Sequence, residues 1–138
     1  MAVLMNLSRI LIRENVQAHI IELREAEGER VFPIQIGLFE AMAIDRRLSG
    51  RQISRPQTHE LLANIIEQMG GRIERVLVND LVQDESGAGT FLARLIISQN
   101  GKELDIDTRP SDAIALGITT DVPIYVEEHV LDDVCREP

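Results

Sequence analysis

Carboxylates are concentrated in the segment 103–108 of the sequence, where acidic and apolar residues alternate. Alternate side chains of a strand point to one face, so Asp105 and Asp107 would lie about 6.5–7 Å apart. Asp112 follows at the next turn of the chain. Oxygen ligands of this kind suit Mg²⁺ or Mn²⁺, and such an ion activates water for attack on a phosphodiester. The segment therefore predicts a divalent metal site formed by Asp105, Asp107 and Asp112.

The same carboxylates have a purely structural interpretation. Surface acids are common, and an edge strand exposes one face to solvent. Asp112 is also favourable in the first turn of a helix, because the helix dipole attracts a negative charge there. Spacing alone favours this interpretation over a metal site.

The segment 55–60 combines an arginine, a hydroxyl and a histidine at the expected start of a helix. Arg55, Thr58 as N-cap and the free backbone N–H groups could hold a phosphate. His59 could accept or donate a proton near neutral pH, with Glu60 beside it. The alternative is a capped helix start with an exposed histidine and an arginine paired to a nearby acid.

The strands and helices expected from the sequence predict one α+β domain over residues 1–138, and these elements must position the residues above. The domain would contain a mostly antiparallel or mixed, curved sheet of six to seven strands and three to four short helices. We expect strands at 3–13, 16–25, 30–36, 72–81, 90–98, 103–108 and 123–126. Pro33 predicts an edge strand because proline cannot donate to the ladder, and Asn100-Gly101 predicts a tight hairpin turn.

Four helices are expected, at 38–48, 58–69, 110–116 and 127–134. The third would begin at Pro110 and end before Gly117. Apolar spacing predicts the inward faces of the first two helices. These faces comprise Leu38, Ala41, Met42 and Ile44 in the first helix, and Leu62, Ile65, Ile66 and Met69 in the second.

The composition limits both the core and the compartment. Three phenylalanines and one tyrosine are the only aromatic residues, which predicts an aliphatic core. Cys135 is the one cysteine, so no internal disulfide can form and a reducing, cytoplasmic location is expected. No secretory signal or apolar run of about 20 residues is present, so no membrane association is expected.

The net charge of −9 argues against non-specific binding to nucleic acid. The charges are unevenly distributed, however. Arginines crowd the segment that contains Arg46, Arg47, Arg51 and Arg55, whereas acids concentrate from Glu103 to the end. A local basic surface could therefore still attract phosphates.

Four stretches, in this order, resemble the bifunctional nuclease domain family: 32–37 (FPIQIG), 55–61 (RPQTHEL), 107–116 (DTRPSDAIAL) and 122–126 (VPIYV). The resemblance covers residues 3–134. It implies a small α+β domain, often oligomeric and here expected as a homodimer, with nuclease activity on RNA and DNA attributed to some members. The polar positions carried over are Arg55, Thr58, His59, Glu60, Asn79, Asp80, Asp107, Arg109, Ser111 and Asp112.

Two functions follow. The first is a metal-assisted nuclease in which His59, Glu60, Asp107 and Asp112 are catalytic, and Asp105, Asp107 and Asp112 hold the ion. Arg55, Thr58, Arg109 and Ser111 would bind the substrate. The second is a non-enzymatic, dimeric binding or regulatory module, in which Arg109 and Asp112 form a structural ion pair at the strand-to-helix turn.

Overall fold

The computed structural model describes residues 1–12, 19–83, 85 and 89–135. The expected turn at Glu14 and Asn15 and most of the expected loop at 84–89 lie outside the described residues. In chain order the elements are β1 (Ala2–Leu11), β2 (His19–Glu25), β3 (Val31–Ile36), α1 (Leu38–Ser49), α2 (Thr58–Gln68), β4 (Gly71–Gln83), β5 (Gly89–Gln99), β6 (Lys102–Thr108), α3 (Pro110–Thr120), β7 (Ile124–Glu127) and α4 (Glu128–Val134).

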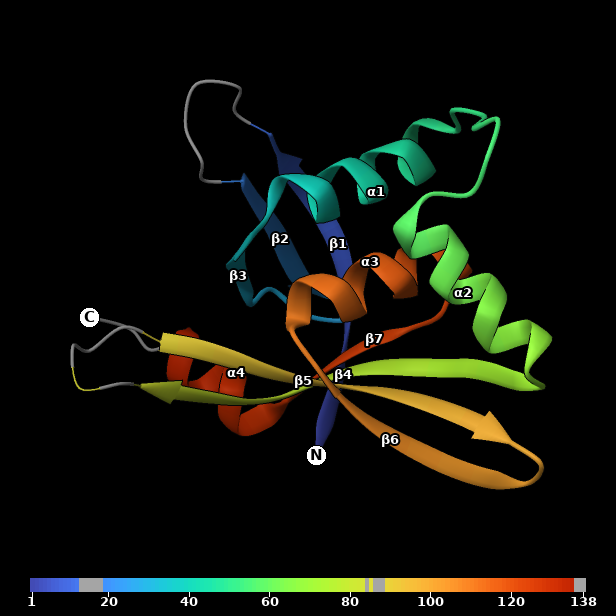
Figure 1. Ribbon diagram of the computed structural model, residues 1–138. Coiled ribbons are helices and arrows are strands. Elements are labelled where there is room, and N and C mark those ends of the chain that lie inside the picture. Colours follow the sequence, from blue (N-terminus) through green and yellow to red (C-terminus); the bar gives the residue numbers. More distant parts are fainter. Residues whose placement is uncertain (13–18, 84, 86–88, 136–138) are drawn as a thin grey trace.

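The strands form one curled, seven-stranded sheet in the order β3-β2-β1-β7-β4-β5-β6 (Figure 1). Neighbouring strands are antiparallel except β4 and β7, which run parallel. The predicted α+β class with a mixed, curved sheet and four helices is confirmed. Pro33 lies on the edge strand β3, and Asn100 and Gly101 have φ of 52° and 77° in the β5–β6 turn, as predicted.

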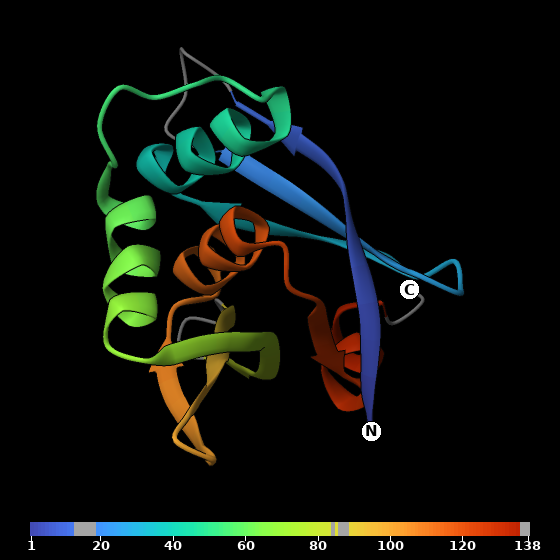
Figure 2. The ribbon, with the colours of Figure 1, turned by 90° about the vertical axis from the view of Figure 1, so that its right-hand side faces the viewer.

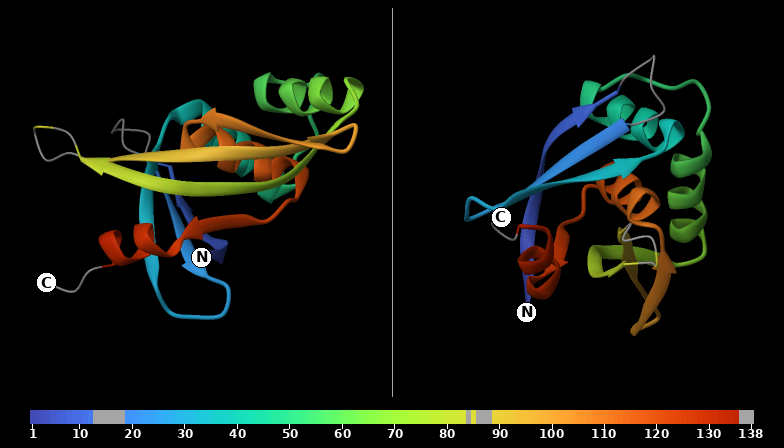
Figure 3. Two further views of the ribbon diagram at one scale, coloured as in Figure 1. Left: turned by 90° about the horizontal axis from the view of Figure 1, so that it is seen from below. Right: turned by 90° about the vertical axis from the view of Figure 1, so that its left-hand side faces the viewer.

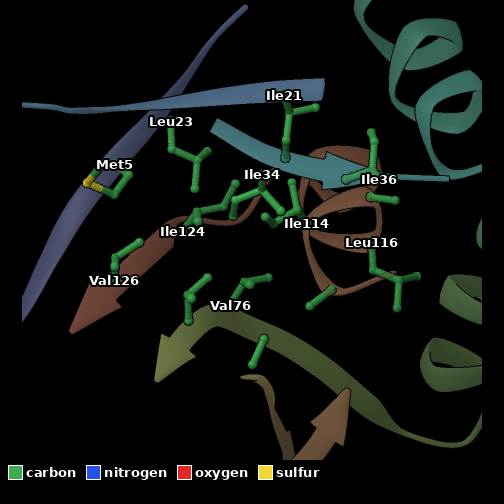
Figure 4. Packing of buried hydrophobic residues seen from close by; sticks show 14 of the residues in the cluster. Met5, Ile21, Leu23, Ile34, Ile36, Val76, Ile114, Leu116, Ile124 and Val126 are labelled. Atoms are coloured by element: carbon green, nitrogen blue, oxygen red, sulfur yellow. The ribbon is translucent and has the colours of Figure 1, made fainter. Parts of the chain in front are cut away.

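Helix α3 lies between the two halves of the curled sheet (Figure 2). Its side chains Ile114 and Leu116 point into a core that includes Ile34 on one side and Val76 on the other (Figure 4). Phe32 is the only fully buried aromatic residue among those described, so the predicted aliphatic core is confirmed. Helix α4 lies against β4 and β7 (Figure 3). No helix in the described part of the chain is long and apolar enough to cross a membrane.

Helix α3 is longer than predicted, since Gly117 does not end it and the helix continues to Thr120, with Asp121 in the left-handed conformation as its C-cap. Gly117 is there because the helix approaches β4 closely. A Cβ on Gly117 would lie 2.9 Å from Cγ2 of Val76, which is fully buried. The glycine therefore permits helix–sheet contact and is not a stop signal.

We expect Gly117→Ala to lower the free energy of unfolding by about 1–3 kcal/mol, because the added methyl group overpacks the core. The gain in helix propensity, about 1 kcal/mol, offsets only part of this cost. Urea unfolding measures the change, with Thr119→Ala as a partly exposed control on the same helix that should shift by about 0.5 kcal/mol or less. A more stable Gly117→Ala variant would contradict the close contact.

The inward faces predicted for the first two helices are confirmed for Ala41 and Ile44 of α1 and for Ile66 of α2, which is partly buried against the core, and are wrong for the other five residues. In α1 the buried residues are Glu40, Ala41, Ala43 and Ile44, while Leu38 and Met42 are exposed. In α2 only His59 is buried, and Leu62, Ile65 and Met69 are exposed. The cause is that α2 contacts α3 and β4 only at the periphery of the fold, and a cleft separates it from β6.

Arg30 connects α4 to the β2–β3 hairpin by ion pairs with three carboxylates. Its Nε lies 2.6 Å from Oε1 of Glu25, and its Nη2 lies 2.7 Å from Oε1 of Glu128. Asp132 is 3.4 Å from Nη1. Hydrogen bonding to Arg30 lowers the pKa of Glu25 below its usual value of 4.5. The pair therefore stabilises the fold above pH 4.5, and this contribution is lost as the pH falls through the lowered pKa.

We expect Glu25→Gln to reduce the free energy of unfolding at pH 7 relative to the wild type. The difference should shrink on acidification, because the wild-type carboxyl is then protonated as well. Chemical unfolding from pH 7 down to the acid range measures this, with Glu27→Gln, in the turn of the same hairpin, as the control. A difference that stays constant with pH would show that the ion pair is not its source.

Candidate functional site

Arg109 joins the first turns of two helices. It is the N-cap of α3, and its Nε and Nη2 donate to Asp112 at 2.8 and 3.1 Å. Nη2 also donates to Oε1 of Glu40 at 2.7 Å. Glu40 and Asp112 are each the third residue of their helix, and neither helix has a side-chain cap. The two acids thus face positive helix ends, and one guanidinium connects them.

The Glu40 carboxylate depends on Arg109 because it is largely removed from water. The Glu40 side chain is only 9% exposed, whereas that of Arg109 is 68% exposed. Gly37 makes room for this carboxylate, since a Cβ there would lie 2.5 Å from Oε2 of Glu40. The hydrogen bonds and charge of Asp112, together with Glu40, raise the pKa of Arg109. The guanidinium is therefore permanently charged.

His59 is held in the same group of side chains. It is 8% exposed, and its Nε2 lies 3.5 Å from Oδ1 of Asp112, which is close enough for an ion pair when the ring is protonated but longer than a usual hydrogen bond. The expectation of an exposed histidine under the structural interpretation is therefore wrong. A carboxylate beside one ring nitrogen favours the tautomer with the proton on that nitrogen, which leaves Nδ1 as an acceptor.

These side chains border a cleft of about 810 Å³ between α1, α2, α3 and the end of β6. Its polar end contains Glu40, Thr58, His59, Arg109 and Asp112. The remaining wall includes the polar residues Arg46, Gln57, Asp107 and Thr108, but it is mostly apolar, with Phe39, Met42, Leu62, Ile66, Leu95, Ile97, Ile106 and Leu116. A hollow of similar size, about 830 Å³, lies between α2, β4 and the end of α3, but none of His59, Arg109 and Asp112 lines it. The first cleft is therefore the candidate site.

The three carboxylates predicted to hold a metal ion are not brought together. Asp105 is on the exposed edge strand β6, with Oδ1 3.7 Å from Nε of Arg94. Asp107 lines the cleft and lies opposite Arg94 in the sheet. It is two residues from Asp105 on β6, so these two side chains point to the same face of the strand. The described residues contain no group of three or more His, Cys, Asp or Glu side chains that could hold a metal.

Of the other predicted site residues, one lines the cleft and the rest do not. Thr58 lines the cleft, but it is the first residue of α2, and Gln57 is the N-cap, without a side-chain hydrogen bond. Glu60 instead pairs with Arg46 of α1 at 3.2 and 3.3 Å. Arg55 is exposed and is not part of the cleft wall. Ser111 is buried at the start of α3 and lines a neighbouring hollow.

Sequence reasoning missed two residues of this site. Glu40 was not considered, although it has the same place in α1 that Asp112 has in α3. That shared position, an acid at the third residue of each helix, is the signal that could have found it. Phe39 was counted among the aromatic residues but not assigned to a site; it is 77% exposed at the mouth of the cleft.

Comparisons with known proteins identify the family of this chain. Residues 21–137 match the bifunctional nuclease domain, and the chain belongs to that family. An uncharacterized protein of Mycobacterium tuberculosis is 42% identical over 112 residues, which cover 81% of this chain and 63% of that protein. Bifunctional nuclease 2 of Oryza sativa subsp. japonica is 28% identical over 83% of this chain and 35% of the plant protein. Bifunctional nuclease 2 of Arabidopsis thaliana is 25% identical over 82% and 33%.

The chain thus matches less than two thirds of the length of these relatives. The match over residues 21–137 includes Glu40, His59, Arg109 and Asp112. The region of similarity therefore contains the whole arrangement described above.

We expect Arg109→Ala to lower the free energy of unfolding by about 1–3 kcal/mol, because Glu40 is then buried without a partner. Glu40→Gln should cost less in the Arg109→Ala background than in the wild type. A double-mutant cycle by urea unfolding measures this coupling, expected at about 0.5 kcal/mol or more. Arg55→Ala is the control and should change stability by about 0.5 kcal/mol or less. Additive effects of the two substitutions would contradict the bridge.

Proposed function

We propose that this chain cleaves phosphodiester bonds of RNA or DNA, with His59 as the general base. The observation that carries this proposal is the placement of His59. It lies beside Asp112 at the polar end of a cleft that the Arg109 guanidinium also borders. A base, an orienting carboxylate and a fixed positive charge can each promote hydrolysis of a phosphodiester. The relatives named bifunctional nuclease support the choice of substrate.

In the proposed reaction, His59 takes a proton from the attacking water as its oxygen forms a bond to phosphorus. The bond from phosphorus to the leaving sugar oxygen breaks, and that oxygen takes a proton from solvent water. The proton held by His59 then returns to solvent and neutralises the hydroxide so formed, which restores the base. Asp112, 3.5 Å from Nε2, orients the ring and stabilises the imidazolium that forms. Asp112 can act in this way only if the His59 ring is held in place, and burial of the ring holds it.

Arg109 is proposed to bind the phosphate. Its Nε and Nη2 are occupied by Asp112 and Glu40, and no partner of Nη1 is found among the described residues. With 68% of the side chain exposed, Nη1 can donate to a phosphate oxygen without breaking the bridge. Thr58 borders the same end of the cleft and can contribute a further hydrogen bond. Roles for Arg55 and Ser111 in substrate binding remain predictions.

A requirement for Mg²⁺ or Mn²⁺ also remains a prediction. The residues do not form a three-carboxylate site, so the steps above assign no role to an ion. Glu60 remains a predicted partner in proton transfer, although its carboxylate is bound by Arg46. Comparison of Glu60→Gln with the wild type and addition of EDTA test these two predictions separately.

The direct test is cleavage of labelled RNA and DNA by purified protein. We expect His59→Gln to slow cleavage by about 100-fold or more, because the general base is lost. Asp112→Asn should also slow it, by a smaller factor, because the ring is less well oriented. His129→Gln is the matched control, since His129 is an exposed histidine of α4 outside the cleft.

Thermal melts must accompany the assay, because Asp112 also pairs with Arg109. His59→Gln that melts like the wild type and cleaves at the wild-type rate would refute the assignment of the base. Undiminished cleavage in every variant would identify a contaminating nuclease.

The second candidate is a binding or regulatory module without catalysis. The observation in its favour is the Arg109–Asp112 ion pair, which fixes the turn from β6 into α3 as this hypothesis expects. Under it, Asp112→Asn lowers the melting temperature, and the wild-type protein binds a protein or a small anionic ligand and does not cleave nucleic acid. A dimeric assembly is expected on either account and remains a prediction.

A further inference from the structure

A second cleft adjoins the candidate site at Arg109. Its volume is about 640 Å³, and it is bordered by the end of β3, the start of β5 and the first turn of α3. Gln35, Thr90, Phe91 and Ser111 are among its lining residues. Arg109 is the one described residue that lines both clefts. The guanidinium therefore separates two neighbouring hollows.

Each hollow has one phenylalanine. Phe39 lines the first cleft and is 77% exposed, and Phe91 lines the second and is half-buried. The ring of Phe91 is supported by that of Phe32, with centroids 5.6 Å apart. The chain has only four aromatic residues, and two of them, Phe39 and Phe91, line the two clefts that meet at Arg109. Aromatic faces beside a cation are the elements on which unpaired bases stack.

The second cleft also has groups suited to a phosphate. Ser111 is buried and lines the cleft, and no hydrogen bond of its hydroxyl is found among the described residues. It lies in the first turn of α3, an 11-residue helix without a side-chain cap, where free N–H groups favour anions. Thr90 adds a second, exposed hydroxyl.

We infer that a single-stranded polynucleotide crosses Arg109, with one unpaired nucleotide in each cleft and the scissile phosphate at the guanidinium. This inference rests on the proposed function and adds the form of the substrate and the mode of cleavage. A strand that continues on both sides of the cut needs no free end, so cleavage is internal. Bases in a duplex are stacked and paired and cannot enter the two hollows.

The charges of the site suit contact with only one or two phosphates. Arg109 is shared with two carboxylates, and Arg46 at the cleft wall is paired with Glu60. With about one or two phosphates neutralised, the slope of log affinity against log salt should be shallow, about −0.7 to −1.4. Stacking in the two clefts then supplies most of the affinity.

The test uses the purified full chain and four substrates of one sequence: circular single-stranded DNA, linear single-stranded DNA blocked at both ends, the same linear strand with free ends, and linear duplex. The inference expects all three single-stranded forms to be cut at similar rates and the duplex at least about 10-fold more slowly. Cleavage that requires an open end, or duplex cleavage at the same rate, would overturn it while leaving the proposed nuclease function intact.

Binding of a fluorescent single-stranded oligonucleotide, followed by anisotropy, tests the path independently of cleavage. Phe39→Ala and Phe91→Ala should each weaken binding by about 5-fold to about 100-fold. Because Phe91 also contacts Phe32, Thr90→Glu provides a second variant in the same cleft, and the added charge should weaken binding as well.

The matched control for these variants is Leu48→Ala, at an exposed apolar residue of α1 that lines neither cleft. Unchanged binding in the Phe91 and Thr90 variants would overturn the second subsite. Absence of both cleavage and binding in the wild type would instead refute the proposed function itself.

Discussion

The bridge from Arg109 to Glu40 and Asp112 is the interaction on which the arrangement of the site depends. A buried carboxylate is costly without a partner, so Glu40 holds the guanidinium in a fixed place. The guanidinium in turn positions Asp112, and Asp112 approaches the ring of His59. Helices α1 and α2, which both contact α3, are thereby coupled with it to a single polar cluster.

The rest of the fold places the ends of these helices. The curled sheet wraps around α3, and Gly117 lets that helix approach β4, which fixes the N-terminus of α3 at the end of β6. Helix α2 is less firmly packed, since His59 is its only buried residue and Leu61, Leu62 and Ile65 are exposed. The cleft between α2 and β6 follows from this loose packing. Its apolar wall and polar end suit a ligand with an apolar ring and a phosphate.

Strands, hairpin and fold class could be predicted because alternation and turn residues are local signals, as Pro33 and Asn100-Gly101 illustrate. His59, Arg109 and Asp112 could be selected as site residues for the same reason, since their motifs are contiguous. Glu40 occupies a helix position that marks it as a candidate, but its pairing with Arg109 could not be predicted, because 69 residues separate the two in sequence and only folding joins them. The metal set remains a prediction: spacing indicated the shared face of Asp105 and Asp107, but it could not show that Asp112 is bound by Arg109.

The central claim is that Asp112 holds His59 in one tautomer beside Arg109. The most direct measurement is a long-range ¹H–¹⁵N NMR spectrum of the histidine side chains in the wild type and in Asp112→Asn, at a pH where the ring is neutral. The account predicts that His59 carries its proton on Nε2 in the wild type and that the variant shows a mixture or the other tautomer. A proton on Nδ1 in the wild type, or an unchanged spectrum in the variant, would contradict it.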